Sequence, residues 1–368
     1  MSRLSRIVVL FLFCSATAVQ SQSFQFLFPG VSGPALLDSL TDRFLPITVL
    51  EYGPARDTLY SKVLAIDDDT VRCIYTGHAL YLDPTQDPTQ YIYLNGSAEG
   101  MNAEHAYPQS KGAADGNARS DMHHLFPVRI PANDARADVP FGEIPDAQTQ
   151  KWFYKNQIIT SIPASNKDAW SESKSDLFEP REVAKGDLAR AVFYFYTMYR
   201  NQANAADPNF FELQRHTLCL WNAQDPADDA ELIKTWRIAA YQENKPNPYI
   251  LDCTLAFRTF CPEVAPNCTV GTQAAALPDL GLRIVPNPFT TVAQVTMELP
   301  FRGAIQGFIR SSTGQEIARF NQTDVPAGTF HWPLEFEGTG QYSIGFLEIH
   351  LTGKDGVRVS RVVPVMKM

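Results

Sequence analysis

The chain has 368 residues, of which 45% are hydrophobic, enough for the core of a globular protein and, by the usual size prior, for about two domains. Its formal net charge is −9, which argues against a nucleic-acid binder that relies on a broad basic surface. The charge leaves open an enzyme that engages a few phosphates through a metal ion and one or two arginines.

The N-terminus has the pattern of a signal peptide. Arg3 and Arg6 precede an apolar run at residues 7–13, and small and polar residues follow at 15–23. The run is too short to span a bilayer, and no later segment approaches that length. We therefore expect residues 1–22 to be removed on export. The exported chain would carry 29 basic against 40 acidic residues and no stable membrane span.

Export permits disulfides, and the five cysteines that follow the signal peptide form an odd set. At least one of them is predicted to lack a partner within the chain. The three that lie close together near the middle of the chain predict a local bridge among themselves, with the pairing left open. The five are Cys73, Cys219, Cys253, Cys261 and Cys268, and the last three form the close group.

Helices and strands are predicted in chain order from hydrophobic spacing. Leu36, Leu37, Leu40 and Phe44 recur at helical spacing and predict a short helix behind Gly33. Two short strands are then expected, separated by a turn rich in proline and aspartate. Their ranges are 71–75 and 91–94.

Two longer helices are expected in the second half of the chain, as scaffold behind a site. The first is predicted over 187–200, where apolar residues share one face. The second is predicted to begin with Asp225 as its N-cap and Pro226 in its first turn. It is expected to stop before Pro246, because proline blocks continuation.

The composition changes after about Cys268. Residues 271–280 are expected to be a linker, and strand-like runs separated by turns follow. This rhythm predicts a small all-β sandwich over 281–368. The expected strands are 294–299, 307–310 and 342–347, with turns at 313–314 and 354–356.

The segment 102–136 holds the side chains that phosphodiester hydrolysis needs. That reaction requires an activated water, neutralised phosphoryl oxygens and a stabilised leaving oxygen. His105 is a candidate base because imidazole titrates near neutral pH. Glu104 and Asn133 offer the oxygen ligands that Mg²⁺ and Ca²⁺ prefer. On a strand, Glu104 and His105 point to opposite faces, so they can serve one water only if the strand twists or ends there.

Structural explanations compete for the same residues. A Glu-His dipeptide is common, and the pair His123-His124 fits one buried and one exposed structural imidazole. Arg119 beside Asp121, and Arg136 beside Asp134 and Asp138, could be surface ion pairs. A zinc site of His105, His123 and His124 lacks both a cysteine ligand and a helical His-x-x-x-His spacing.

Several ordered motifs resemble the bacterial endonuclease I family, which belongs to the His-Me finger (ββα-metal) nucleases. The resemblance covers about residues 50–255. It implies an α+β fold in which residues 23–270 form a ββα-metal nuclease domain with a helical scaffold, ahead of the β-sandwich. The runs that carry it are 102–110, 119–127, 133–136, 140–142, 178–190 and 220–226.

The resemblance also implies roles for single residues. His105 would be the general base, and Arg119 would contact the scissile phosphate. Glu104 and Asn133 would hold one divalent metal, with Mg²⁺ expected first and Ca²⁺ or Mn²⁺ as alternatives. Three further residues would support these groups or contact phosphate: His123, His124 and Arg136. Members of the family cleave DNA, and often RNA, with little sequence preference, typically leaving 5′-phosphates.

The C-terminal region resembles a type IX secretion sorting domain. The motifs are Val285 to Phe289, Ser312 to Gln315, and a basic residue near the end, Lys367. The type IX secretion machinery would then be a partner, and the protein would pass through the periplasm to the medium or the cell surface. The alternative is a generic β-sandwich that binds a partner or a carbohydrate.

The sequence is compatible with three functional hypotheses. The first is a secreted, nonspecific, divalent-metal-dependent endonuclease that acts on DNA, with RNA as a further candidate substrate. The second is a non-catalytic, surface-anchored protein that binds nucleic acid or carbohydrate; such a protein would tolerate the loss of a catalytic group, whereas all are present here. The third is a zinc-dependent phosphodiesterase, which copurifying zinc would reveal.

Overall fold

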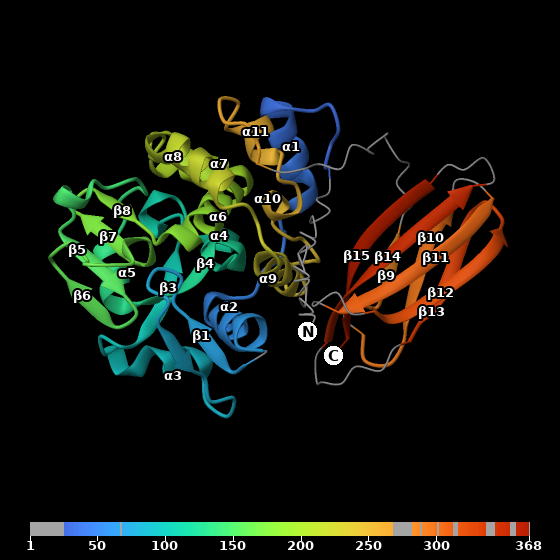
Figure 1. Ribbon diagram of the computed structural model, residues 1–368, viewed down its shortest axis with the longest axis horizontal. Helices are drawn as coiled ribbons and strands as arrows, with labels where there is room; N and C mark the ends of the chain where they lie inside the picture. The colour runs from blue at the N-terminus through green and yellow to red at the C-terminus, as the bar shows by residue number, and fades with distance from the viewer. Residues whose placement is uncertain are drawn as a thin grey trace, which may run out of the picture.

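The computed structural model describes residues 26–66, 68–267, 282–287, 289–299, 302–311, 316–335, 343–353 and 358–367. The predicted signal peptide and linker lie outside these residues. Helices and small sheets make up residues 26–267, whereas the later described segments contain strands alone (Figure 1). This mixture confirms the predicted α+β class. None of the described helices combines the length and apolarity that a bilayer span requires.

Buried hydrophobic residues form two separate clusters. One draws its members from Leu27 to Cys261, and the other from Phe289 to Val365. The first cluster positions the candidate site.

The entry region is helical. Helix α1 (Gly33–Phe44) buries Leu36, Leu37, Leu40 and Phe44, which confirms the predicted helix. Helix α2 (Tyr52–Thr58) continues into one π-helical stretch, Leu59–Leu64. A short hairpin of β1 (Thr70–Arg72) and β2 (Ala79–Tyr81) follows, so the first predicted strand is present but shorter than expected.

The predicted strand at 91–94 is wrong. This segment forms helix α3 (Pro88–Tyr93). The Asp87 side chain accepts a hydrogen bond from the Gln90 backbone N–H, and Pro88 occupies the first turn. A cap and an N-terminal proline therefore override the aromatic and β-branched side chains that suggested a strand.

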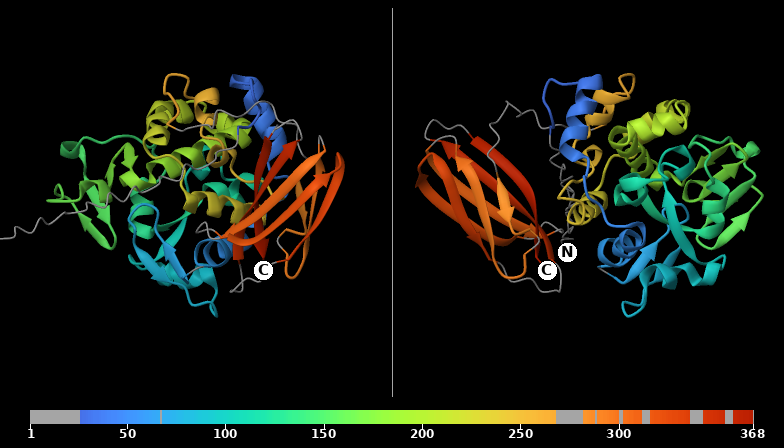
Figure 2. Two further views of the ribbon diagram at one scale, coloured as in Figure 1. Left: turned by 45° about the vertical axis from the view of Figure 1, so that its right-hand side comes forward. Right: turned by 180° about the vertical axis from the view of Figure 1, so that it is seen from behind.

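A two-stranded antiparallel hairpin lies at the centre of residues 26–267. Strand β3 (Met101–His105) pairs with β4 (Leu125–Arg129), and helix α5 (Ile130–Arg136) follows directly. Helix α4 (Gly116–Ser120) and a 3₁₀ turn, Met122–His124, lie in the connection between the strands. Figure 2 shows the hairpin from two further sides, among the surrounding helices.

A four-stranded antiparallel sheet follows α5, with strand order β6-β5-β7-β8. Its edge strand β8 leads into helix α6 through a short 3₁₀ turn. The bounds are β5 (Lys151–Tyr154), β6 (Gln157–Ile159), β7 (Ser171–Lys174) and β8 (Leu177–Glu179).

Helix α6 (Lys185–Met198) is the central helix and is buried along almost its whole length. It confirms the helix predicted over 187–200, although α6 begins two residues earlier and α7 (Arg200–Ala206) starts a new helix at its end. Helix α8 (Phe210–Gln224) packs against α6 and was not predicted. Two short helices, α10 (Pro248–Leu251) and α11 (Leu255–Thr259), complete this part.

The second predicted scaffold helix is present, but its start was misplaced. Helix α9 spans Asp229–Ala239, and its N-cap is Asp228, which forms a reciprocal capping box with Glu231. The Asp225 carboxylate instead accepts a hydrogen bond from the Gly186 backbone N–H at 2.9 Å. Asp225 therefore ties the end of α8 to the start of α6.

The described disulfide joins two cysteines that are far apart in the sequence. Cys261 pairs with Cys219, 42 residues away in the sequence. Cys253 is also disulfide-bonded, and Cys268 lies outside the described residues. Cys73 is buried and free, as the odd count required. Helix α8 brings Cys219 to the end of α11, so Cys261 does not take part in a bridge within the close group, and a bridge from Cys253 within that group stays a prediction.

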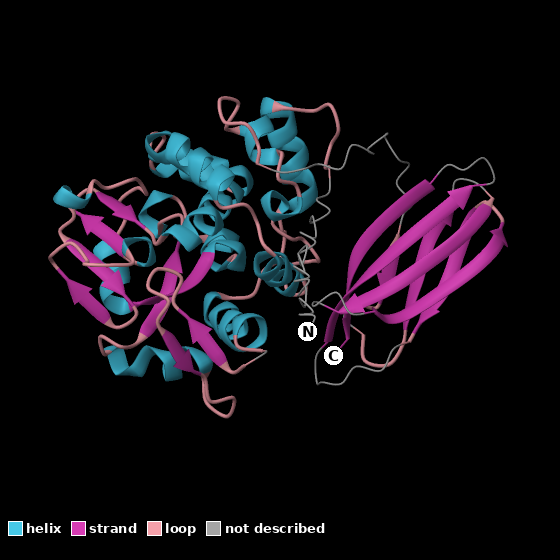
Figure 3. Ribbon diagram, in the orientation of Figure 1, coloured by secondary structure: helices cyan, strands magenta, loops and turns pink. Residues whose placement is uncertain are grey.

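The C-terminal strands form two antiparallel sheets around one core, consistent with the predicted sandwich (Figure 3). Their orders are β13-β10-β9 and β12-β11-β14-β15, and all three predicted strands are present. The turns predicted at 313–314 and 354–356 lie outside the described residues. The bounds are β9 (Arg283–Val285), β10 (Ala293–Leu299), β11 (Gly303–Ser311), β12 (Glu316–Val325), β13 (Gly328–Leu334), β14 (Ser343–Gly353) and β15 (Arg358–Lys367).

Candidate functional site

The hairpin places the Glu-His pair at the end of a strand. Glu104 and His105 are the last two residues of β3, paired with Phe126 and Leu125 of β4. The next residue, Ala106, donates its backbone N–H to the His124 carbonyl. Strand β3 ends at His105, as the sequence required if the two side chains were to serve one site.

The His105 ring has a defined tautomer. Its Nε2 lies 2.9 Å from the Arg119 carbonyl oxygen, which can only accept, so Nε2 carries the proton. The other ring nitrogen, Nδ1, is then unprotonated and accepts a long hydrogen bond, 3.4 Å, from Gln109 Nε2. Burial, together with His124 and the nearby arginines, lowers the pKa of His105 to about 3. The imidazole is therefore neutral at neutral pH and presents a lone pair.

Glu104 is a buried carboxylate held by two neighbours. Its Oε1 accepts a hydrogen bond from the Tyr75 hydroxyl at 2.8 Å and lies 3.1 Å from Arg136 Nε in an ion pair. Burial raises the pKa of Glu104 to about 7, against the opposing effects of Arg136 and Tyr75. Arg136 is itself fully buried and also donates to the Ala106 carbonyl, so it is not a surface partner of its neighbouring aspartates.

Helix α5 brings Asn133 to the end of β3 that carries Glu104. Asn133 and Arg136 are three residues apart in α5 and share a face of the helix. Asn102 and Glu104 are two residues apart in β3 and lie on the same face of the strand. The two faces meet, because Asn133 Nδ2 donates to Asn102 Oδ1 at 2.7 Å while Arg136 pairs with Glu104. Asn133 therefore lies beside Glu104 although 28 residues separate them in the sequence.

The oxygen atoms at this junction fit a hard divalent cation. Tyr75 and Arg136 contact Glu104 through Oε1, and Asn133 reaches Asn102 through its Nδ2, so Glu104 Oε2 and Asn133 Oδ1 are the oxygens that could bind a cation. One carboxylate and one amide oxygen suit Mg²⁺, which usually keeps several waters and takes few protein ligands. Among the described residues, no three His, Cys, Asp or Glu side chains gather as a metal-binding group.

Arg119 is exposed and does not pair with Asp121. Its guanidinium carbon lies 4.5 Å from the centroid of the Tyr52 ring, and no described carboxylate forms an ion pair with it. The Tyr52 ring in turn lies 5.6 Å from the His105 ring. The guanidinium and the imidazole therefore border the same aromatic side chain, with the guanidinium open to solvent.

The two neighbouring histidines take different positions, both buried. The His124 ring lies 5.3 Å from the His105 ring, and its Nε2 donates to the Ala118 carbonyl. His123 Nε2 donates to the Lys245 carbonyl at 2.9 Å, toward the end of α9. Burial lowers the pKa of both imidazoles, that of His124 to about 4. His124 supports the His105 ring, whereas His123 joins the hairpin connection to the scaffold helices.

Asp121 is a buried hub rather than a surface partner of Arg119. Its carboxylate accepts four hydrogen bonds at 2.8 to 3.0 Å, which tie the segment before β4 to α6 and to the turn after α9. The donors are the Tyr194 and Tyr199 hydroxyls, Gln242 Nε2 and the His123 backbone N–H.

We expect Asp121→Asn to lower the free energy of unfolding by about 3 kcal/mol, because hydrogen bonds to a charged acceptor contribute about 1.5–3 kcal/mol and the amide meets donors with its own N–H₂. Urea unfolding followed by circular dichroism measures the change. The exposed Asp168, substituted in the same way, serves as the control. Equal stability of Asp121→Asn and the wild type would contradict the proposed hub.

Charged residues of the run 178–190, which carries part of the family resemblance, form an ion-pair network with their neighbours. Lys185 Nζ contacts three carboxylates, those of Glu143, Glu179 and Glu182. Arg190 pairs with Glu231, and with Asp187 at 3.5 Å. These charges are neutralised within the scaffold.

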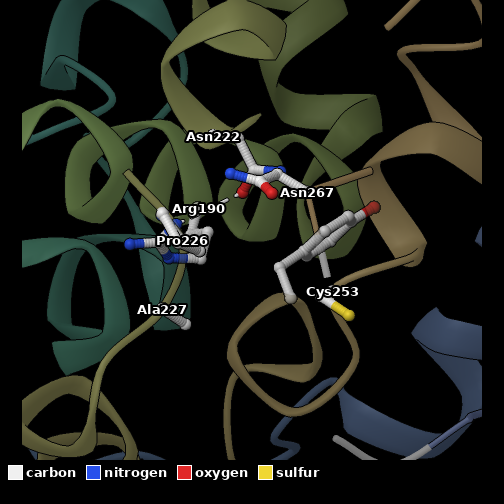
Figure 4. Close-up of a pocket in the computed structure, with 7 residues that line it drawn as sticks. Arg190, Asn222, Pro226, Ala227, Cys253 and Asn267 are labelled. Carbon is white, nitrogen blue, oxygen red and sulfur yellow. Dashed lines mark hydrogen bonds between the residues drawn. The ribbon is translucent and has the colours of Figure 1, made fainter. Parts of the chain in front are cut away.

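A small pocket beside Arg190 holds none of the predicted site residues. Figure 4 shows Arg190 facing Asn222, to which its Nη1 donates at 3.4 Å. The remaining lining comes from the loop before α9 and from the segment around α10 and α11: Pro226, Ala227, Tyr249, Cys253 and Asn267. Arg190 is already bound to Glu231, so this pocket belongs to the scaffold.

Sequence reasoning missed Tyr52 and Arg56. Both lie on α2, about 50 residues before the central motif. The Arg56 guanidinium carbon is 4.4 Å from the Tyr52 ring centroid. Their four-residue spacing shows that they share a helix face, but nothing in the sequence links that face to His105.

Comparison with known proteins gives a family model and two relatives. The model described as Endonuclease I matches residues 36–253. The chain is 30% identical over 173 residues to an extracellular ribonuclease of Bacillus subtilis (strain 168), a match that covers 43% of this chain and 53% of that protein. An extracellular ribonuclease of Bacillus amyloliquefaciens is 28% identical over 240 residues, which cover 60% of this chain and 72% of that protein.

The chain thus spans about half the length of the Bacillus subtilis relative. Among solved structures, FlgD from Xanthomonas campestris matches with a TM-score of 0.19 at 12% identity, over 24% of this chain and 65% of that chain. A likeness at that level carries no argument about fold or function.

Proposed function

The chain belongs to the Endonuclease I family, and on that premise we propose that it is an exported, divalent-metal-dependent endonuclease that hydrolyses phosphodiester bonds in DNA and in RNA. The two relatives are named as extracellular ribonucleases, which supports RNA as a substrate and an extracellular place of action. The alternative of a non-catalytic binding protein gains no support from the site, because each proposed catalytic group is present and positioned.

The observation that carries the proposal is the orientation of His105. Its protonated Nε2 is held by the Arg119 carbonyl, and its Nδ1 is unprotonated and accepts only a long hydrogen bond, 3.4 Å, from Gln109 Nε2. As a water oxygen forms a bond to phosphorus, Nδ1 takes the proton of that water, and the bond from phosphorus to the leaving oxygen breaks. The exposed Arg119 guanidinium can offer paired N–H groups to the phosphoryl oxygens.

We assign the hairpin of β3 and β4 with helix α5 as the ββα-metal finger. Glu104 and Asn133 would hold one divalent cation through a carboxylate oxygen and the amide oxygen, with Mg²⁺ preferred over Ca²⁺ or Mn²⁺. A bound cation would supply charge stabilisation to the phosphoryl group and the leaving oxygen. Arg136 positions the Glu104 carboxylate, and His124 packs behind the base.

Degradation of plasmid DNA and of ribosomal RNA by the purified protein tests this function. We expect both to be cut with Mg²⁺, no cutting after dialysis against EDTA, and recovery when Mg²⁺ is restored. Zinc that survives dialysis and sustains cutting would favour the third function instead. Folded protein that cuts neither polymer with any divalent cation would refute the nuclease.

We also propose that residues 1–22 direct export and that residues 281–368 are a type IX secretion sorting domain. The support is the charge and apolar pattern of the first segment and the motifs of the second. Cell fractionation of the native host tests the route. The full chain should reach the cell surface or the medium, whereas a chain that lacks 281–368 should stay in the periplasm. Equal release of both chains would contradict the sorting role.

A further inference from the structure

Two arginines lie against one tyrosine beside the proposed base. The Arg56 and Arg119 guanidinium carbons are 4.4 and 4.5 Å from the Tyr52 ring centroid, so they are at most about 9 Å from each other. The same ring lies 5.6 Å from the His105 ring. Helix α2 sets this arrangement, because Tyr52 and Arg56 are four residues apart and share a face.

Neither arginine is neutralised by a carboxylate among the described residues. The Asp57 carboxylate, next to Arg56, is turned to Thr89, whose hydroxyl and backbone N–H donate to it. The one hydrogen bond of the Arg56 side chain joins Nε to the Tyr52 carbonyl at 3.4 Å. Most other described arginines of residues 26–267 are ion-paired: Arg72, Arg129, Arg136, Arg190, Arg200, Arg215 and Arg258.

The free donors of Arg56 and Arg119 suit an anion that approaches from solvent. Arg119 is exposed, and Arg56 and Tyr52 are half-buried. Stacking on an aromatic ring holds a guanidinium in place and leaves its N–H edges available, and these edges match the oxygens of a phosphate. In an acidic chain of net charge −9, two unneutralised cations beside a neutral imidazole form a local anion site.

We propose that Arg56 binds a second phosphate of the substrate, next to the one that Arg119 contacts. This proposal rests on the proposed nuclease function and deepens it, because it assigns Arg56 to substrate recognition. The substrate class is a polynucleotide with consecutive phosphates, and Tyr52 is the positioning residue that holds both arginines beside His105.

Equilibrium binding of a fluorescein-labelled single-stranded oligonucleotide tests Arg56 directly. The full chain carrying His105→Ala is compared with the same chain carrying Arg56→Ala as well, by fluorescence anisotropy over a salt series. We expect Arg56→Ala to weaken binding roughly tenfold at low salt. The slope of log affinity against log salt should fall by about 0.7, the value for one lost phosphate contact on a single strand. Arg56→Lys should recover the slope and only part of the affinity.

Arg43→Ala is the matched control, because Arg43 also lies over aromatic rings, those of Phe28 and Phe44, without a described ion pair. It should leave affinity and slope unchanged. In the enzyme with His105 intact, Arg56→Ala should raise KM more than it lowers kcat. The role of Arg56 would be overturned if Arg56→Ala did not change the affinity, or if Arg43→Ala weakened binding by the same factor. Neither result would bear on the nuclease function. No binding by the His105→Ala chain would count against the nuclease function itself.

Discussion

His105→Ala is expected to lower kcat by about 10² to 10⁴-fold while the protein keeps its fold. The expected loss is large because His105 ends β3 beside the Arg119 backbone with its Nδ1 unprotonated, so the proposed mechanism depends on this nitrogen to take the proton of water. Steady-state cleavage of plasmid DNA at saturating Mg²⁺ measures kcat, and circular dichroism verifies the fold.

The control for His105→Ala is His216→Ala, which removes an exposed imidazole from α8. This control should keep wild-type turnover. His105→Ala with wild-type turnover would show that another group activates the water. Loss of activity in both variants would point to a general effect of removing histidine rather than to the base.

Glu104→Gln is expected to raise the half-saturating Mg²⁺ concentration at least about tenfold and to lower turnover by about 10²-fold. Glutamine keeps the shape of the side chain but removes the charge that would hold the cation. It also leaves the buried Arg136 guanidinium without its partner, which costs about 3–5 kcal/mol of stability. Turnover is therefore measured across a Mg²⁺ series at a temperature where unfolding curves show the variant to be folded.

Glu179→Gln provides the matched control, because Glu179 is another buried, ion-paired glutamate, bound to Lys185 in the scaffold. It should lose stability without a change in the metal requirement. The metal assignment would be refuted if Glu104→Gln kept the wild-type half-saturating concentration, or if Glu179→Gln shifted that concentration by the same factor.

The central part of the site could be predicted because its members are close in sequence. A strand, a return strand and a short helix were enough to bring Asn133 and Arg136 onto the strand that carries Glu104. Because Glu104 and His105 are neighbours in sequence, they can serve one site only if the strand twists or ends there, and β3 does end at His105. The roles of these residues in catalysis stay predictions that the experiments above test.

The parts that could not be predicted depend on contacts between distant segments. Tyr52 reaches the site from α2, and the donors that surround Asp121 come from α6 and from beyond α9. From the sequence alone, Asp121 fitted a surface ion pair with Arg119, because the residues that donate hydrogen bonds to it are far away in the chain. The pairing of Cys219 with Cys261 has the same cause.

The misassigned elements have a local cause. At 91–94, strand propensity competed with an N-cap and a proline at 87–88, and the cap decided the outcome. At the start of α9, Asp225 was the predicted cap, but Asp228 caps the helix and forms a reciprocal box with Glu231. In both cases the hydrogen bond of the cap outweighed the pattern of side chains.

The single-turnover cleavage rate of a labelled oligonucleotide bound to excess protein tests the central claim most directly, because it separates chemistry from binding and product release. The account predicts that the wild type and His105→Ala bind the oligonucleotide equally, that the wild type cleaves it only with divalent metal, and that His105→Ala cleaves it about 10² to 10⁴-fold more slowly. Equal cleavage rates for the two proteins, or wild-type cleavage at full rate in EDTA, would contradict it.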